Sequence, residues 1–370
     1  MAHSLDRLTV RGFKSIRSLE QFELRRLNVL IGANGAGKSN FVSLFTLLRA
    51  IVMQELELTV KKAGGADIQL YLGPKTTKKI EVELHFGLNG YQFSLEPTAD
   101  NRLVFSDEHV FFSGDYGPTQ RLLGRGHFES RLKDLKDAPG VTAERGIPYH
   151  VFESVESWTV YHFHDTSESA AVRRKGTTRD YEKLRPDAAN LAAFLLHTKK
   201  RYPQKYQLIQ ESVRLVAPFF DDFKLRPEEL AGDTVVQLEW SQRGSDYPFH
   251  PSQLSDGTLR FLCMATALLQ PSPPATMLFD EPELGLHPYA LGVLAGLLQQ
   301  AATQRQVIVS TQSATLIDHF EPEDVVVVDR DEGASTFRRL DSHGLTEWLK
   351  QYSLGELWEK NVVEGGPVHE

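Results

Sequence analysis

The stretch Gly32–Ser39, GANGAGKS, combines the residue types that bind nucleotide phosphates. It matches G-x-x-x-x-G-K-[ST] at every fixed position, and an apolar run precedes it while a helical pattern follows. Its glycines let successive backbone N–H groups turn toward phosphate oxygens, and the following helix N-terminus adds positive potential. In such a site Lys38 is expected to bridge the terminal phosphates and Ser39 to ligate Mg²⁺. A Gly-rich turn before an ordinary helix is the alternative, but the strand–loop–helix order favours a nucleotide site.

Two acids, Asp280 and Glu281, follow the apolar run Met277–Phe279. In phosphate-loop enzymes the first acid after such a strand holds Mg²⁺, usually through water. The second acid is positioned to take a proton from an attacking water. A surface turn that begins DEPE would also explain the pattern, although the phosphate loop elsewhere in the chain makes that explanation weaker.

A third stretch, LSDGT at Leu254–Thr258, has the pattern of a helix entrance, with Ser255 as its cap. It contains no catalytic nucleophile. A helix N-terminus in this place carries positive potential that an anionic ligand could meet.

The elements that must position these residues follow from hydrophobic periodicity. A helix is predicted from about Lys38 to Leu56, and Asn89-Gly90 is a strong signal for a hairpin. The region 100–165 favours strands and loops. Residues 187–222 indicate two helices that separate near Tyr202-Pro203. Residues 234–240, TVVQLEW, are typical of one strand.

The last third of the chain consists of short elements. The pattern predicts helices at about 258–269 and 290–304, and strands at 275–283, 306–313 and 324–330. Strands that alternate with helices indicate a mostly parallel sheet covered on both faces. Neither an internal repeat nor a long heptad array is visible.

Composition restricts the class of protein. The chain has 370 residues, 41 % of them hydrophobic and 24 % charged, which is ordinary for a globular protein. The single cysteine, Cys263, is expected in the core and fits a reducing cytosol. No apolar run is long enough to cross a membrane, and the N-terminus lacks a signal-peptide pattern. We therefore expect a cytoplasmic protein without membrane contact. The net charge of −8 means that any contact with DNA must use a local basic patch.

Five motifs occur in the order typical of an ABC-type ATPase head. They are Gly32–Ser39, Leu254–Thr258, Met277–Pro282, Glu283–Pro288 and Ser310–Ser313. The run GFKSI near the N-terminus, Asn40 and EPELGLHP resemble the SMC/RecF/OLD branch of these ATPases. The resemblance implies an α/β fold: a phosphate-loop NTPase head with a mostly parallel sheet flanked by helices, a β-rich antiparallel subdomain and a helical subdomain.

The resemblance also predicts a division of the chain. Residues 1–165 form a first lobe with the phosphate loop and the β-rich subdomain. Residues 166–250 form a helical insert of the second lobe. Residues 251–335 carry the signature, acidic-strand and switch motifs, and residues 336–370 form a C-terminal tail.

The family implies ATP and Mg²⁺ as cofactors and an ATP-dependent, head-to-tail homodimer. In such a dimer the signature loop of one copy closes over the γ-phosphate held by the other copy. The residues expected to bind the nucleotide are Asn34, Gly35, Ala36, Gly37, Lys38, Ser39 and Asn40, together with Ser255, Asp256 and Gly257 in trans. The Mg²⁺ ligands are Ser39 and Asp280, and the catalytic residues are Glu281 and Gln312.

This sequence departs from the family pattern at two positions. Asp256 stands at the second position of the signature, where the family has Gly or a common alternative, so the family's contact geometry in trans carries over least directly there. Gln312 stands at the switch position that is usually His; it can donate a hydrogen bond to the γ-phosphate or orient water, but it cannot be protonated. Hydrolysis is therefore expected to be slow. The family's glutamine that follows the β-rich lobe has no clear counterpart. The stretch YHFHDTS lies where it should fall, so His164 or Asp165 is the candidate for a metal contact.

The biological purpose is less constrained than the chemistry. Basic clusters at 75–79, 121–133, 173–179 and 197–201 could contact DNA phosphates, or could be solvated loops balanced by nearby acids. The residues after Ser313 are too few for the nuclease domain of OLD-type proteins, so we expect a stand-alone ATPase with a separate effector. Trp348 and Trp358 would dock a partner or pack onto the ATPase. A role in phage defence or DNA maintenance competes with a nucleotide-gated scaffold that hydrolyses little, and with a transporter subunit.

Overall fold

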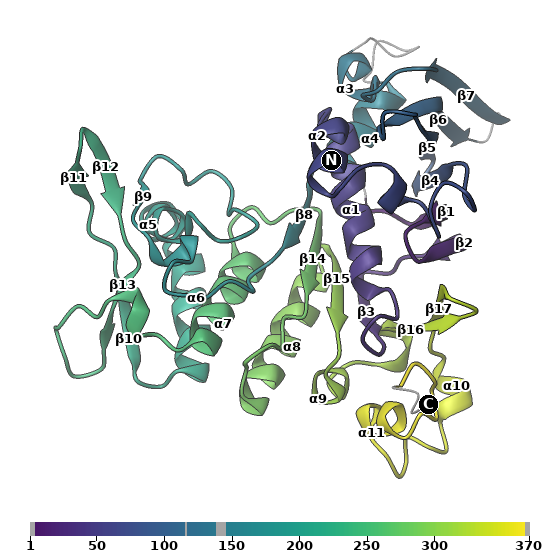
Figure 1. Cartoon of the computed structure of the whole chain (residues 1–370). Helices are drawn as coiled ribbons and strands as arrows, with labels where there is room; N and C mark the ends of the chain where they lie inside the picture. Colours follow the sequence, from purple (N-terminus) through teal and green to yellow (C-terminus); the bar gives the residue numbers. More distant parts are fainter. Residues whose placement is uncertain (1–3, 115–116, 138–145, 367–370) are drawn as a thin grey trace. The chain divides into compact units, whose positions relative to one another are not determined.

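The computed structural model describes residues 4–114, 117–137 and 146–366, and the chain divides into two compact units. The first unit comprises Met1–Trp158, Pro274–Thr276 and Pro322–Glu370. The second comprises Thr159–Pro273 and Met277–Glu321. Each unit therefore combines segments that lie far apart in the sequence (Figure 1).

The first unit contains an antiparallel sheet of six strands in the order β2-β1-β4-β5-β6-β7. Its strands are β1 (Arg7–Phe13), β2 (Ile16–Glu23), β4 (Ile80–Phe86), β5 (Asn89–Pro97), β6 (Leu103–Gly114) and β7 (Gly117–Gly124). Burial alternates along β4, as expected for a strand with one face in the core. This sheet is the β-rich antiparallel subdomain that the sequence predicted.

The hairpin between β4 and β5 is present, but its turn is not at Asn89-Gly90. Phe86 pairs with Asn89, so the two loop residues are Gly87 and Leu88. Gly87 has φ +60°, which suits the first position of a tight hairpin turn. Gly90 lies inside β5 for a different reason: a Cβ there would lie 1.9 Å from the ring of Phe111. The sequence signal was two residues off because packing, not the turn, requires this glycine.

The phosphate-loop strand also belongs to the first unit. There β3 (Leu27–Ile31) runs parallel to β16 (Val325–Asp331), which pairs antiparallel with β17 (Ala334–Arg339). All five residues of β3 are buried, as is usual for a strand covered on both faces. The helix that follows, α1 (Lys38–Met53), ends slightly before the predicted boundary because Gln54 adopts a left-handed conformation.

The remaining helical elements of this unit are short. They are α2 (Leu56–Lys62), η1 (Asp67–Gln69), α3 (Leu132–Leu135), α4 (Ile147–Glu156), η4 (Pro322–Asp324), α10 (Ser342–Leu345) and α11 (Leu354–Glu359). The helix α4 falls in a region that was expected to be strands and loops. Aromatic rings pack α1 and β4 against the residue that follows α4 and Ser157: the ring of Trp158 lies 5.0 Å from that of Phe45 in α1 and 6.1 Å from that of Phe86 in β4.

The second unit is mainly helical. Its longer helices are α5 (Leu191–Arg201), α6 (Pro203–Val216), α7 (Asp256–Leu269) and α8 (Pro288–Ala302), and its shorter elements are η2 (Ala171–Arg173), η3 (Pro251–Gln253) and α9 (Ala314–Ile317). As predicted, α5 and α6 separate at Tyr202. Cys263 is buried in α7, and burial raises the pKa of its thiol to about 12.

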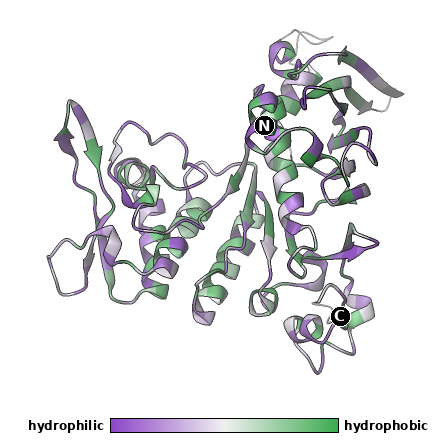
Figure 2. Ribbon diagram, in the orientation of Figure 1, coloured by the Kyte–Doolittle hydropathy of each residue, from purple (hydrophilic) through white to green (hydrophobic). Residues whose placement is uncertain are grey.

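Strands of the second unit fall into three groups. The first group has the order β15-β14-β8 and consists of β15 (Gln306–Thr311), β14 (Thr276–Asp280) and β8 (Trp158–Tyr161). The first residue of β14 and the first residue of β8 belong to the first unit. Both β14 and β15 are coloured as hydrophobic in Figure 2 and are almost completely buried.

Two small sheets complete this unit. In one, β12 (Asp233–Val236) lies between β11 (Glu228–Leu230) and β9 (Gly176–Thr177); in the other, β10 (Phe220–Lys224) pairs with β13 (Glu239–Gln242). The predicted single strand 234–240 is thus wrong. It is divided between β12 and β13, which belong to different sheets. Within the described ranges, no helix is both long and apolar enough to cross a membrane.

The position of Gly90 gives a test of packing in the antiparallel sheet. Gly90→Ala is expected to lower the free energy of unfolding by about 1–3 kcal/mol, because the new Cβ overlaps the ring of Phe111. Gly296→Ala in α8 is the matched control, since no atom lies within 4 Å of its added Cβ and alanine favours a helix. Urea unfolding measures both changes. A Gly90→Ala protein as stable as the control would contradict the packing described.

Candidate functional site

The phosphate loop folds around the side chain of Lys38. The Nζ of Lys38 donates to the carbonyl oxygen of Gly32 at 2.7 Å and to that of Ala33 at 3.1 Å, and the residue is only 5 % exposed. Asn34, Gly35 and Ser39 are exposed. The loop therefore holds its ammonium group close to its own backbone and presents its tip and the first turn of α1 to a ligand.

Gly37 sets the direction of the chain as it enters α1. Its φ is +118°, in the region that favours glycine, and a Cβ there would lie 2.0 Å from Ser335 Oγ and 2.8 Å from Ser15 Oγ. Ser335 Oγ donates to the carbonyl oxygen of Ala36 at 2.6 Å and lies 2.7 Å from Ser15 Oγ. Asn40 donates from Nδ2 to the same Ser15 Oγ at 2.8 Å. Two serines about 320 residues apart thus hold the back of the loop.

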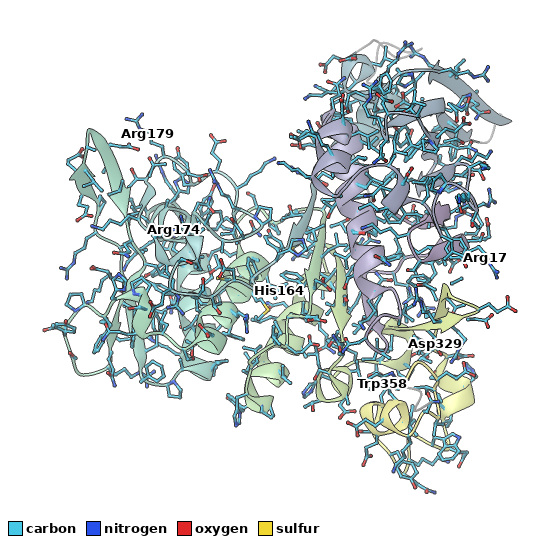
Figure 3. The ribbon with its side chains drawn as sticks, in the orientation of Figure 1. Arg17, His164, Arg174, Arg179, Asp329 and Trp358 are labelled. Atoms are coloured by element: carbon cyan, nitrogen blue, oxygen red, sulfur yellow. The ribbon has the colours of Figure 1, made fainter. Side chains whose placement is uncertain are left out.

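The C-terminal segment supports the start of the loop. The backbone N–H of Ala33 donates to the carbonyl oxygen of Gly365 at 3.0 Å, and the indole Nε1 of Trp358 donates to the same oxygen at 3.1 Å. Gly365 in turn donates its N–H to Asp329 Oδ2 at 3.2 Å. Figure 3 shows Trp358 and Asp329 in this part of the first unit. Trp358 is therefore a packing residue, whereas Trp348 is 47 % exposed.

The second unit carries the acidic turn at the end of β14. Glu281 has φ +45°, which is uncommon for a non-glycine residue and is often found at functional sites. Its N–H donates to the carbonyl oxygen of Ser310 in β15 at 2.7 Å. The Nε2 of Gln312 donates to Glu281 Oε1. The structure therefore brings the two predicted catalytic residues into direct contact.

Asp280 has the property expected of a metal ligand. Its Oδ1 is buried and has no hydrogen-bond partner among the described residues, which is costly for a carboxylate unless a cation or water satisfies it. Carboxylate oxygens are among the ligands that Mg²⁺ prefers, so the buried Asp280 oxygen fits such an ion chemically. In the described ranges, no group of three or more His, Cys, Asp or Glu side chains forms a metal cluster by itself.

His164 and Asp165 differ in their relation to this turn. His164 lies beside it, with Nε2 2.8 Å from the carbonyl oxygen of Asp280. The Asp165 carboxylate accepts from the backbone N–H and the hydroxyl of Ser167, and the hydroxyl contact lowers the pKa of Asp165. Of the two candidates, His164 is the one that contacts the acidic turn.

The signature stretch forms the N-terminus of α7. Ser255 caps this helix as predicted, and its Oγ accepts from the N–H of Thr258 at 3.2 Å. The helix begins at Asp256, two residues before the predicted start. Gly257 is packed so closely that an added Cβ would lie 2.3 Å from the carbonyl oxygen of Gly285, in the turn that follows β14. The signature helix and the acidic turn are thus in contact within one unit.

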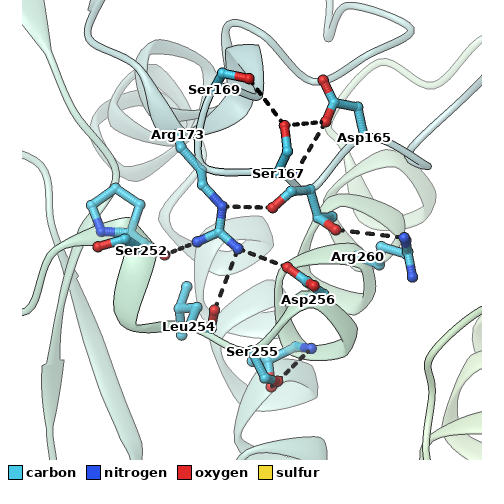
Figure 4. Close-up of polar contacts among 12 residues, drawn as sticks. Asp165, Ser167, Ser169, Arg173, Ser252, Leu254, Ser255, Asp256 and Arg260 are labelled. Carbon is cyan, nitrogen blue, oxygen red and sulfur yellow. Dashed lines mark hydrogen bonds and ion pairs between the residues drawn. The ribbon is translucent and has the colours of Figure 1, made fainter.

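Arg173 fixes the signature turn from inside the second unit (Figure 4). Its guanidinium donates to the carbonyl oxygens of Thr166 and Leu254 at 2.9 Å and 3.4 Å, to that of Pro251, and to Asp256 Oδ1 at 3.0 Å. The side chain of Arg173 is 6 % exposed, whereas that of Asp256 is 63 % exposed. The unusual acid of the signature is therefore neutralised by an arginine of the same chain.

Arg260 lies one turn after Asp256 in α7, and like Arg173 it donates hydrogen bonds to backbone carbonyl oxygens. It donates to the carbonyl oxygens of Phe163, His164 and Leu284 at 3.1 Å, 2.9 Å and 2.8 Å. These bonds join the segment after β8, the signature helix and the turn after β14. Figure 4 shows Arg260 and Arg173 on either side of the 165–169 segment.

Sequence reasoning missed several residues that hold these sites. Arg173 was assigned to a basic cluster for DNA, yet it is buried. No sequence signal indicates that it contacts the start of the signature helix, which lies about 80 residues later in the chain. Ser15, Ser335 and Arg260 were not singled out, because a lone Ser or Arg carries no pattern. His287, in the motif Glu283–Pro288, is the cap of α8, and its Nδ1 accepts from the N–H of Tyr289 at 3.2 Å. Asp329 lies in β16, within the predicted strand 324–330, and its carboxylate accepts from the N–H of Gly365.

The fold and the motifs define a class: a phosphate-loop protein of the ABC type whose fold is similar to that of SMC head domains. Solved structures with a similar fold include "the SmcHead bound to the C-winged helix domain of ScpA", with a TM-score of 0.60 and 15 % identity over 93 % of this chain and 99 % of that chain. A second is an Smc head domain from Pyrococcus furiosus with an extended coiled coil, bound to the C-terminal domain of ScpA. Its TM-score is 0.56, with 15 % identity over 94 % of this chain and 99 % of that chain.

Sequence comparison gives the family. The chain belongs to the family described as "AAA domain, putative AbiEii toxin, Type IV TA system", whose profile matches residues 27–318. It is also 21 % identical over 285 residues to "Structural maintenance of chromosomes protein 3" of Arabidopsis thaliana, a match that covers 75 % of this chain and 22 % of that protein. The chain thus spans about a fifth of the length of this relative.

Arg173 provides a test of how the signature turn is held. Arg173→Ala is expected to destabilise the protein by at least about 2 kcal/mol, because it leaves several carbonyl oxygens without their buried donor. Arg179→Ala is the control, since that side chain is 84 % exposed and lies 3.9 Å from Asp233; it should change stability by less than about 0.5 kcal/mol. Figure 3 shows Arg179 at the outside of its unit. Equal midpoints of thermal unfolding for the two variants would show that Arg173 does not hold the turn.

Proposed function

We propose that this protein binds ATP with Mg²⁺ and hydrolyses it slowly. The observation that carries the proposal is the hydrogen bond from Gln312 to Glu281, next to a buried Asp280 oxygen that has no partner among the described residues. Such an arrangement pairs an oriented general base with a metal-binding carboxylate. The phosphate loop with its buried Lys38 supplies the complementary group for the nucleotide.

In this proposal the residues have separate roles. The N–H groups of the loop from Asn34 to Asn40 and the ammonium group of Lys38 bind the phosphates. Ser39 and Asp280 hold Mg²⁺, which supplies charge neutralisation at the phosphate oxygens. Glu281 accepts the proton of the attacking water, and Gln312 fixes the orientation of Glu281 by donating to its carboxylate. Gln312 acts as a hydrogen-bond donor throughout, because an amide does not titrate.

The signature helix contributes to a second copy of the chain. We propose that ATP drives a head-to-tail homodimer in which the N-terminus of α7 contacts the γ-phosphate in trans. Ser255, Asp256 and Gly257 lie at that N-terminus. The bond from Arg173 offsets the negative charge of Asp256, so this acid is compatible with an anionic ligand nearby. This supports a role for the signature in spite of its unusual residue.

The ATPase controls a partner effector or DNA binding, in phage defence or in DNA maintenance. The similarity to SMC heads, two of them bound to parts of ScpA, supports a nucleotide-controlled partner. Exposed cations such as Arg174 could contact DNA phosphates, although Lys175 and Arg179 pair with Glu228 and Asp233 in the same unit. The rate of ATP hydrolysis, measured with duplex DNA and with a polyanion that is not a nucleic acid as the control, separates control by DNA from control by a protein partner. Stimulation by DNA alone indicates control by DNA.

Lys38→Ala tests the nucleotide site. Removal of the ammonium group is expected to weaken ATP binding by roughly 100-fold or more, because charge-assisted bonds to phosphate are lost. Isothermal titration calorimetry with Mg-ATP measures this change. Lys78→Ala is the matched control, because Lys78 is exposed and binds only the nearby carbonyl of Pro74 among the contacts described. An unchanged ATP affinity in Lys38→Ala would remove the phosphate loop from the proposed site.

Glu281→Gln tests the general base. The amide keeps an oxygen that can accept from Gln312 but cannot take a proton, so the turnover number should fall by roughly 100-fold or more. ATP affinity should stay within about threefold, and an ATP-bound dimer should accumulate in size-exclusion chromatography. Glu211→Gln, on the exposed face of α6, should leave both values unchanged. Hydrolysis by Glu281→Gln at the wild-type rate would show that Glu281 is not the base.

A further inference from the structure

A second buried acid, Glu283, lies two residues beyond the proposed base, in the turn between β14 and α8. Its Oε1 accepts from the backbone N–H of Gln312 at 2.8 Å. Its Oε2 is buried and has no hydrogen-bond partner among the described residues. Burial raises the pKa of this carboxyl, and the nearby charge of Glu281 acts in the same direction. A carboxyl in this position is unfavourable by itself and calls for a compensating role.

The turn does not need the Glu283 side chain for its own backbone. The N–H of Leu284 donates to the carbonyl oxygen of Glu281 at 3.3 Å, and the N–H of Leu286 donates to that of Glu283 at 3.0 Å. Arg260 donates to the carbonyl oxygen of Leu284 at 2.8 Å. Backbone bonds and one arginine therefore close the turn, while the Glu283 carboxyl contacts a residue on another segment.

Gln312 is thus held at two points by the same acidic turn. Its backbone N–H binds Glu283, and its side-chain Nε2 binds Glu281. The position directly follows β15, whose residues are all buried, so the backbone of Gln312 leaves a rigid strand and is then fixed by Glu283. A side chain whose backbone is fixed in this way has fewer orientations from which to donate to Glu281.

We propose that Glu283 is a positioning residue that acts on the base Glu281 through Gln312. Glu283 anchors the backbone of Gln312, Gln312 orients the carboxylate of Glu281, and Glu281 receives the proton. This chain of three residues resembles the general arrangement in which a base is oriented by a second group that is itself held by a third. The inference rests on the proposed ATPase function. It assigns a role to Glu283, which has none among the nucleotide-binding, metal-binding and catalytic residues of that proposal.

Four variants test this inference by steady-state hydrolysis and by ATP binding: Glu283→Ala, Glu283→Gln, Gln312→Ala and the double variant Glu283→Ala/Gln312→Ala. Glu283→Ala is expected to lower kcat by roughly tenfold or more and to change the Kd for ATP by less than about threefold. Glu283→Gln retains an oxygen that accepts from the N–H of Gln312, so it should restore kcat to within about threefold of the wild type. The double variant should be no slower than Gln312→Ala, since the two residues act in series.

Several outcomes would overturn the inference. A normal kcat in Glu283→Ala, together with a reduced kcat in Gln312→Ala, would show that Gln312 needs no anchor. A further loss in the double variant would show that Glu283 acts independently of Gln312. A loss in Glu283→Ala that Glu283→Gln does not restore would point to a role for the charge itself. A parallel fall in ATP affinity and unfolding temperature would make the role purely structural.

Failure of the proposed function has a different signature. In that case the wild-type protein shows no ATP hydrolysis that depends on Lys38, and all four variants equal the wild type. Such a result contradicts both the proposed function and the role of Glu283. Glu211→Ala, which removes an exposed acid of the same unit, controls for a general effect of losing a negative charge.

Discussion

A glycine-rich loop binds phosphate more tightly when its backbone is held in place before the ligand arrives, because less ordering is then needed on binding. In this protein that support comes from distant parts of the chain. Ser15 and Ser335 hold the back of the loop at Gly37, and the carbonyl oxygen of Gly365 binds its first N–H group. Gly37 permits this close approach because it has no Cβ, which would overlap the two serine hydroxyls. Its φ of +118° is also one that glycine adopts readily. The C-terminal segment therefore supports the phosphate loop directly, although none of its residues belongs to the motif.

The second unit is organised around backbone carbonyl groups bound by two arginines. Arg173 and Arg260 donate mainly to carbonyl oxygens of the segment after β8, of the signature turn and of the turn after β14. Such bonds fix the path of these loops. In the proposed function, this network links the signature helix, which faces a second copy, to the acidic turn that carries the base. It also explains how Asp256 is accommodated at a position where an acid is unexpected.

Much of the fold could be predicted because its signals are local. The spacing of the phosphate loop, the apolar run before Asp280 and the cap at Ser255 each depend on a few neighbouring residues, and the structure contains the elements that they predict. The hairpin turn was misplaced at Asn89-Gly90 because a glycine is required at position 90 by the ring of Phe111 on the neighbouring strand, and not by the turn. Strand 234–240 divides because its two halves pair with different partners. Arg173, Ser335 and Glu283 could not be assigned for the same reason: each acts through contacts with residues distant in sequence.

The central claim is that the chain is an ATPase whose site is completed by the signature helix of a second copy. The most direct test is the specific rate of ATP hydrolysis as a function of protein concentration, at saturating Mg-ATP. The claim predicts that the rate per chain rises with concentration and then reaches a plateau, because only dimers hydrolyse ATP. The midpoint of this rise should match the dissociation constant of the ATP-bound dimer from analytical ultracentrifugation. A rate per chain that is constant from well below to well above this value, or the absence of hydrolysis at any concentration, would contradict the claim.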